Sequence, residues 1–315
     1  MTADPRWQKD AFGVDLSGIQ KVVDYPALAP YVDFYIARLG HGKWTYNNIA
    51  DPAVAIDAMF ATHCQGAWDT GKPFGAYFVF DPTVDADPGN PLMDRQIKVI
   101  MAALKGKVGK SVHFLAIDVE IGKGPDGGNI PSVIISTKVM NMVKALHNIY
   151  PTLRIGIYTG QWFIDQFSKD LGIGINELYS SAKDWFFTWI ARYPNDSDWT
   201  GTGIQKAQWS DFRDKFAPEW PVDKAFPWMC NGGAKIWQYS GDKYTADGYY
   251  GEVKGALSSL DLNYFDGTLG ELHIWCSYMP HYNAPNTTPT TTPTVPTSNL
   301  TDSQKLDAIY KAVVK

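Results

Sequence analysis

VHFLAIDVEIG, residues 112–122, is an apolar, β-branched run that carries two carboxylates near its end. This composition is typical of a buried strand, in which side chains alternate between two faces. Asp118 and Glu120 are therefore expected to share one face with Phe114. Two acids placed in this way repel each other and lose hydration, which raises one pKa and leaves the other group ionised, as acid and base roles require. The alternative is a solvated strand end with two exposed acids.

Similar apolar runs recur along the chain and alternate with helical patterns. We expect strands at residues 12–16, 32–37, 74–80, 113–121 and 154–159, and helices at 52–70, 93–107, 131–149 and 161–171. This spacing implies parallel pairing. Further strands are expected at 186–192, 234–239 and 259–263, while 193–233 lacks a strong helical period. The sequence predicts an α/β fold, a TIM-like β/α barrel that is irregular in its second half, with a doubly wound sheet as the alternative.

The composition changes after Tyr282, which marks a predicted domain boundary. We assign residues 1–283 to the barrel domain. Residues 284–299, APNTTPTTTPTVPTSN, are expected to form an extended linker because they cannot bury a core. Residues 300–315 are predicted to form a short helix, with Thr301 and Gln304 as its capping box. Such a helix is marginal alone, so we expect it to pair with another chain or to begin a further module, with a frayed tail as the alternative.

Charge and composition exclude several classes of partner and ligand. The net charge of −5 and the lack of a long basic run argue against nucleic acid. No apolar run is long enough to span a bilayer, and the N-terminal MTADPRWQKD has no apolar stretch of the kind found in secretory signals. The three cysteines and six histidines show no metal-ligand spacing, so we expect reduced, buried thiols and no metal site.

Two further acids lie at the ends of expected strands. Asp15 closes the first strand in FGVDLS, and Asp261 lies in the last one, in LDLNYF. The first and last strands of a closed barrel are neighbours, so Asp15, Asp118, Glu120 and Asp261 are expected at one rim. Cleavage of a glycosidic bond needs an acid for the leaving oxygen and a second group at the anomeric centre.

Eight motifs, in order, carry a family resemblance over residues 12–267: FGVDLSGIQ, VDFYIARLGHG, GAYFVF, FLAIDVE, GIYTGQWF, FFTWIARY, KIWQYS and LDLNYFDG. The ordered set resembles the lysozymes of glycoside hydrolase family 25, muramidases of bacteria, fungi and phage endolysins. The resemblance implies a flattened β/α barrel with incomplete helices in its second half. It also implies retaining cleavage of the β-1,4 bond between N-acetylmuramic acid and N-acetylglucosamine, without a metal or organic cofactor.

The resemblance also implies roles for individual residues. Glu120 would be the general acid, and Asp118 would assist at the anomeric centre, either directly or by orienting the substrate's acetamido group. Asp15 and Asp261 would complete the acidic cluster. The matching motifs place these residues in the sugar groove: Tyr77, Tyr158, Trp189, Tyr193 and Gln238. Barrel filling is the alternative for Tyr158 and Trp189.

One departure from the family pattern is Phe78, which stands where family members often have histidine and is expected to alter a groove contact. The predicted partner is the peptidoglycan glycan strand, with no nucleic acid and no membrane insertion. The protein is expected to be a phage lysin, released from the host cytoplasm to the wall, or a virion-associated hydrolase. The alternatives are a non-catalytic glycan-binding or structural phage tail protein on the same barrel, and a chitinase of the family 18 type.

Overall fold

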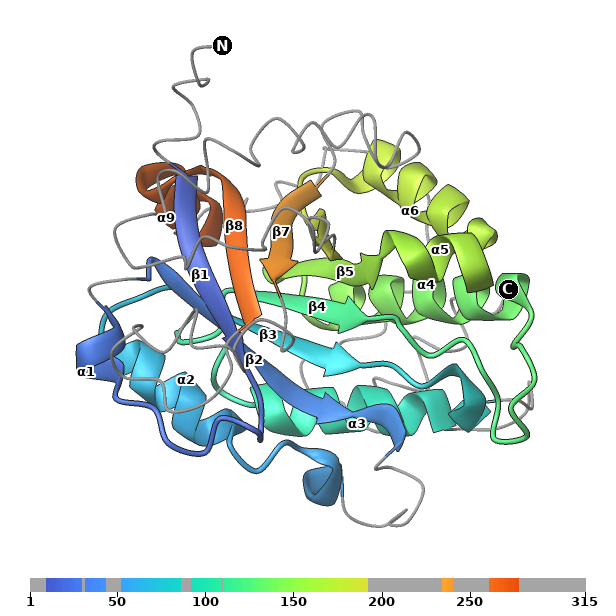
Figure 1. Ribbon diagram of the computed structural model, residues 1–315, viewed down its shortest axis with the longest axis horizontal. Coiled ribbons are helices and arrows are strands. Elements are labelled where there is room, and N and C mark those ends of the chain that lie inside the picture. Colours follow the sequence, from blue (N-terminus) through green and yellow to red (C-terminus); the bar gives the residue numbers. More distant parts are fainter. Residues whose placement is uncertain are drawn as a thin grey trace, which may run out of the picture.

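The computed structural model describes residues 10–29, 32–43, 52–85, 92–108, 110–191, 234–240 and 261–277. Within these ranges, eight strands close into a barrel in sequence order (Figure 1). The predicted β/α barrel is confirmed, because a doubly wound sheet would have two open edges. The segment 193–233, the predicted linker 284–299 and the predicted helix 300–315 all lie outside the described residues.

The barrel strands are β1 (Asp10–Leu16), β2 (Phe34–His41), β3 (Phe74–Val79), β4 (Phe114–Asp118), β5 (Arg154–Gly160), β6 (Phe186–Ala191), β7 (Ala234–Ser240) and β8 (Asp261–Thr268). Neighbours from β1 to β7 are parallel. The last strand, β8, runs antiparallel to both β7 and β1. Asp261 therefore begins β8 rather than ending a strand, and the reversal places it beside Asp15 at the end of β1.

The helices in the described ranges are α1 (Tyr25–Leu28), α2 (Phe60–Asp69), α3 (Leu92–Leu104), α4 (Ser132–Ile149), α5 (Gln161–Phe167), α6 (Lys169–Ala182) and α9 (Leu269–Ser277), with 3-10 turns η4 (Pro52–Ala55) and η5 (Pro82–Asp85). The expected helix at 52–70 is thus a turn followed by α2. The one expected at 161–171 breaks at Ser168, whose φ of −151° is not helical. The sequence patterns missed α1, which has a single turn, α9, which has little polar–apolar periodicity, and most of α6, which continues to Ala182 beyond the expected end at residue 171.

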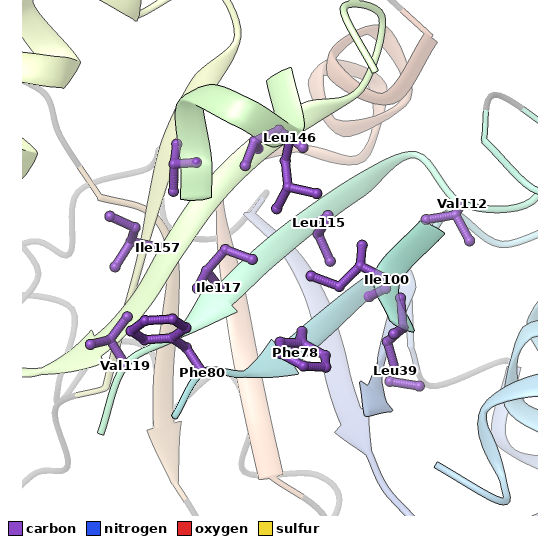
Figure 2. Packing of buried hydrophobic residues seen from close by; sticks show 14 of the residues in the cluster. Leu39, Phe78, Phe80, Ile100, Val112, Leu115, Ile117, Val119, Leu146 and Ile157 are labelled. Carbon is purple, nitrogen blue, oxygen red and sulfur yellow. The ribbon is translucent and has the colours of Figure 1, made fainter. Parts of the chain in front are cut away.

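Alternation along the strands builds two hydrophobic layers. On β4, Phe114 and Ala116 belong to a cluster inside the barrel, whereas Leu115 and Ile117 belong to a cluster outside it. Figure 2 shows the outer layer, where Leu115 and Ile117 of β4 lie on the same side as Leu146 of α4. Each side chain buried in this layer contributes about 1.5–3 kcal/mol, so this layer holds the helices on the barrel.

Aromatic side chains close the amino end of the barrel. The α9 helix lies beside the start of β1 in Figure 1. Its Trp275 ring lies 5.1 Å from Phe114, 5.2 Å from Phe187 and 5.3 Å from Phe265, between ring centroids. Arg154 Nε donates a hydrogen bond to the Trp275 carbonyl at 3.0 Å. With this end filled by rings, polar side chains inside the barrel gather at the opposite, carboxyl end.

The expectation of reduced, buried thiols is met in the described part of the chain. Cys64 and Cys276 are free, buried thiols, and Cys230 lies outside the described residues. Among the helices of the ranges given above, none is both long and apolar enough to cross a membrane.

Candidate active site

The structure brings the four predicted acids to one rim of the barrel. Asp15 lies near the end of β1 and is the register partner of Asp261 at the start of β8. Asp118 is the last residue of β4. Glu120 follows just beyond that strand, which ends three residues before the expected boundary. Parallel strands end at one rim and the reversed strand begins there, so residues far apart in the sequence meet.

Glu120 keeps the orientation that alternation predicts, although it lies outside β4. The Val119 N–H donates to the Tyr158 carbonyl at 2.9 Å, and the Val119 carbonyl accepts from Thr159 Oγ1 at 2.9 Å. Val119 is fully buried in the outer layer. Because the chain stays paired with β5 at this point, Asp118 and Glu120 on either side of Val119 face the barrel interior.

Asp15 is buried in a hydrogen-bond network of side chains. Its Oδ2 accepts from Gln238 Nε2 at 2.9 Å and from Asn263 Nδ2 at 2.7 Å. The Tyr158 hydroxyl donates to Gln238 Oε1 at 2.7 Å, and Trp189 Nε1 donates to Asn263 Oδ1 at 2.8 Å. Each amide is thereby oriented with its N–H toward Asp15. Donors aimed in this way stabilise a carboxylate and fix its position.

Asp118 and Glu120 share the effects of burial and like charge. Burial, followed by repulsion from Glu120 and Asp15, raises the pKa of Asp118 well above its ordinary value, while Arg38 opposes the rise. Burial and then Asp15 raise the pKa of Glu120 from 4.5 to about 7. Asp118 Oδ1 is buried without a hydrogen-bond partner among the described residues. The rim therefore retains a proton near neutral pH, as acid catalysis requires.

Tyr77 lies among these acids on an inward position of β3. Its ring meets Trp189 edge to face, with centroids 5.8 Å apart. Burial, together with the charges of Asp15, Asp118 and Asp261, raises the pKa of the Tyr77 phenol well above 10. The hydroxyl therefore stays protonated and can donate a hydrogen bond at the centre of the cluster.

Sequence reasoning missed a cation at this rim. Arg38 continues the inward face of β2 and pairs through Nε with Asp57 Oδ2 at 2.7 Å. The buried Asp57 also accepts from the Gly18 and Met59 backbone N–H groups, each at 2.9 Å. Asp57, in the segment before α2, is thus tied to β2 by the ion pair and to the segment after β1 by the Gly18 hydrogen bond. Side chains also alternate along FYIARLGH, residues 34–41. The same rule would therefore have predicted that Arg38 faces the barrel interior, because it follows the inward Ile36 by two residues.

Three of the residues assigned to the sugar groove are buried. Tyr158, Trp189 and Gln238 are 7%, 1% and 3% exposed, and the contacts described above join them to each other, to Asp15 and to Asn263. Their contact with a glycan stays a prediction. Tyr193 lies outside the described residues.

Phe78 does not occupy the position that its motif suggested. It is fully buried in the outer layer, among the side chains labelled in Figure 2. Tyr77 faces the interior, so its neighbour Phe78 must face the helices. The expectation that Phe78 alters a groove contact is therefore wrong.

The His63 ring is a structural hydrogen-bonding group in the fold. His63 Nδ1 lies 2.5 Å from the Tyr25 hydroxyl, and His63 Nε2 lies 3.0 Å from the Ser17 carbonyl. Burial lowers the pKa of His63, so the ring is neutral at pH 7. In the part of the chain that the structure describes, no three His, Cys, Asp or Glu residues are grouped so that they could hold a metal ion.

Comparison with known proteins gives similarity at the level of the fold. No family model and no curated protein sequence matches the chain. The catalytic domain of endolysin ply40, from a bacteriophage of Listeria monocytogenes, is 18% identical with a TM-score of 0.53, covering 85% of this chain and 98% of that one. A muramidase from Acremonium alcalophilum is 20% identical with a TM-score of 0.55, covering 85% and 99%. A family 25 glycosyl hydrolase from Bacillus anthracis is 18% identical with a TM-score of 0.52, covering 88% and 97%.

These neighbours define a class of barrel. The chain shares its fold with structures described as a family 25 glycosyl hydrolase, a muramidase and an endolysin catalytic domain. At 18–20% identity the likeness establishes the fold alone, and any activity must be argued from the site itself.

Proposed function

We propose that this protein is a peptidoglycan hydrolase that cleaves the β-1,4 bond between N-acetylmuramic acid and N-acetylglucosamine with retention. The observation that carries the proposal is the meeting of Asp15, Asp118, Glu120 and Asp261 at one rim, with a proton retained on Glu120 up to about pH 7. The fold shared with muramidases supports the same substrate. We further propose that the protein acts as a phage lysin or a virion-associated wall hydrolase, as the endolysin neighbour suggests.

In the proposed reaction, Glu120 donates its proton to the oxygen that leaves as the glycosidic bond breaks. The two neighbouring acids share one proton, which Glu120 carries in the reactive form, so Asp118 is ionised. Positive charge develops at the anomeric carbon, and Asp118 stabilises it, either by bonding to that carbon directly or by orienting the substrate's acetamido oxygen to bond to it. Water then attacks the anomeric carbon of this intermediate and gives a proton back to Glu120, which restores the acid and retains the configuration. Asp15 contributes a fixed negative charge because two amide donors hold its carboxylate in place. The protonated Tyr77 hydroxyl supplies a hydrogen-bond donor beside these acids.

Burial distinguishes the proton donor from its partner. Glu120 is partly exposed, whereas Asp118 is only 5% exposed. A general acid must exchange protons with solvent in each cycle and works best with a pKa near the working pH. Glu120 meets both conditions, because its pKa is about 7 and part of its side chain reaches the surface.

The test is the loss of turbidity of purified bacterial cell walls. The wild type is expected to clear the walls, and Glu120→Gln is expected to lose at least a hundredfold in rate, since a general acid contributes roughly 10²–10⁴. Glu177→Gln, on the exposed side of α6, is the matched control and should clear walls at the wild-type rate. Equal clearing by wild type and Glu120→Gln would remove Glu120 from the proposed role.

Mass spectrometry of the released fragments identifies the bond that is cleaved. Fragments that end in reducing N-acetylmuramic acid support the proposed linkage. Fragments from chitin but not from peptidoglycan would indicate a chitinase instead. Binding to the wall without new reducing ends would indicate a glycan-binding protein on the same barrel.

A further inference from the structure

Trp162 is a half-exposed aromatic residue next to the acidic rim. Its side chain is 46% exposed, although indole is among the largest apolar groups in the chain. It lies in the first turn of α5, directly after the end of β5. Asp118 on β4 is the register partner of Tyr158 on β5, so β5 reaches the same rim as the acids.

Packing holds the indole in place. No Cβ fits at Gly160 because Trp162 Nε1 and Cδ1 occupy that space. The rings of Phe163 and Phe167 meet the indole at 88° and 90°, with centroids 5.7 and 6.4 Å away. Phe163 is itself fully buried, so this support is part of the core. The exposed part of the indole is therefore presented in a defined orientation, without the cost of ordering it on binding.

Phe167, which packs against the Trp162 indole, also lies close in space to the segment that follows the proposed proton donor, Glu120. The ring of Phe167 fills the space where a Cβ at Gly122 would lie, and Gly122 follows Glu120 by two residues. The loop that begins at Gly122 is held by two backbone hydrogen bonds, from Gly124 N–H to the Gly128 carbonyl at 2.8 Å and from Ile130 N–H to the Gly122 carbonyl at 2.9 Å. Trp162 thus packs against Phe167, which in turn contacts the start of this hydrogen-bonded loop next to Glu120.

We propose that the indole of Trp162 is a stacking platform for an N-acetylated hexose ring of the glycan strand, adjacent to the sugars whose linkage is cleaved. The inference rests on the proposed function for the identity of the strand. A pyranose ring presents C–H groups on one face, and a flat aromatic surface covers that face while the hydroxyl groups at its edge remain hydrated. The four acids at the rim fix where the scissile bond must lie, and Trp162, in the first turn of α5, lies at the same end of the barrel.

The expected effect follows from the area involved. An indole that is 46% exposed offers roughly 100 Å² of apolar surface. A sugar ring that covers about half of this surface removes enough of it from water to change affinity by about tenfold. Binding away from the scissile bond is the same in ground and transition states, so the change is expected in KM rather than in kcat.

The test compares Trp162→Ala, Trp162→Tyr and Trp68→Ala on soluble, uncrosslinked peptidoglycan strands. Trp68 is the matched control, because it is 55% exposed but lies near the end of α2, which precedes the start of β3 at the opposite end of the barrel. Trp162→Ala should raise KM about tenfold, with kcat within about twofold of wild type. Trp162→Tyr, which retains an aromatic face, should recover most of the loss, and Trp68→Ala should match the wild type.

A binding measurement separates this proposal from the proposed function. Calorimetry with the same strands is carried out on Glu120→Gln and on Glu120→Gln combined with Trp162→Ala, so that no cleavage is needed. A weaker affinity only in the double variant supports the platform, even if the wild type proves to lack hydrolase activity. Unchanged affinity and KM in the folded Trp162→Ala variant, or an equal loss in Trp68→Ala, would overturn it.

Discussion

Replacing Glu120 by glutamine should make the protein more stable at pH 8 while removing most of the proposed hydrolase activity. Burial and the charge of Asp15 raise the pKa of Glu120 from 4.5 to about 7 in the folded chain. The native state therefore holds a proton that the unfolded chain releases over this interval. Because the native state binds more protons there, the free energy of unfolding falls as pH rises from about 4.5 to 7, and this contribution stays constant above 7.

The size of the effect follows from the pKa difference. About 1.4 kcal/mol for each pKa unit gives roughly 3 kcal/mol for Glu120. Partial exposure of the side chain makes this an upper value. Glutamine has nearly the same shape and no charge, so Glu120→Gln removes the free-energy cost of holding an ionised carboxylate in this buried position. At pH 8 the variant should be more stable by about 1–3 kcal/mol, and at pH 4 the two proteins should be nearly equal.

Urea denaturation of wild type, Glu120→Gln and the exposed control Glu177→Gln, each at pH 4, 6 and 8, measures these differences. The difference in the free energy of unfolding between Glu120→Gln and the wild type should increase from pH 4 to pH 8. Glu177→Gln should have the same free energy of unfolding as the wild type at each pH. A Glu120→Gln variant that is destabilised by the same amount at pH 4 and pH 8 would refute the reasoning. It would mean that the carboxyl group is held by favourable contacts rather than strained by burial.

Three further outcomes are expected. The rate of wall clearing should fall about tenfold for each pH unit above about 7, as Glu120 loses its proton; a flat profile from pH 5 to 9 would contradict this. Arg38→Met should lower the free energy of unfolding by about 3 kcal/mol in urea titrations, because it leaves the buried Asp57 carboxylate with its backbone N–H donors but without its cation, and a loss below about 1 kcal/mol would show that the pair contributes little. Gly75→Ala should destabilise the fold by about 1–3 kcal/mol, because the ring of Phe114 already fills the Cβ position, and calorimetry showing an unchanged melting temperature would argue against that packing.

Local patterns in the sequence were sufficient for the strands and for the direction of their side chains. The apolar run around Asp118 marks a strand, and strict alternation separates the inward Phe114 from the outward Leu115. The same rule places Asp118 and Glu120 on one side. These features depend on residues within a few positions of one another, because the period of a strand is a property of the backbone. The α/β class with parallel strands follows from the spacing of such runs, whereas the choice between a closed barrel and a doubly wound sheet does not.

Only the tertiary structure decided how the site is built and why Glu120 holds a proton up to about pH 7. The reversal of β8 brings Asp261 to Asp15, and the donors that hold Asp15 come from Gln238 and Asn263, which lie 223 and 248 residues away in the sequence. The raised pKa of Glu120 arises first from burial, which is a property of the packed barrel and not of any segment. Alternation is local and can be recognised along the chain. Contacts across the barrel and the loss of hydration exist only when all eight strands have closed.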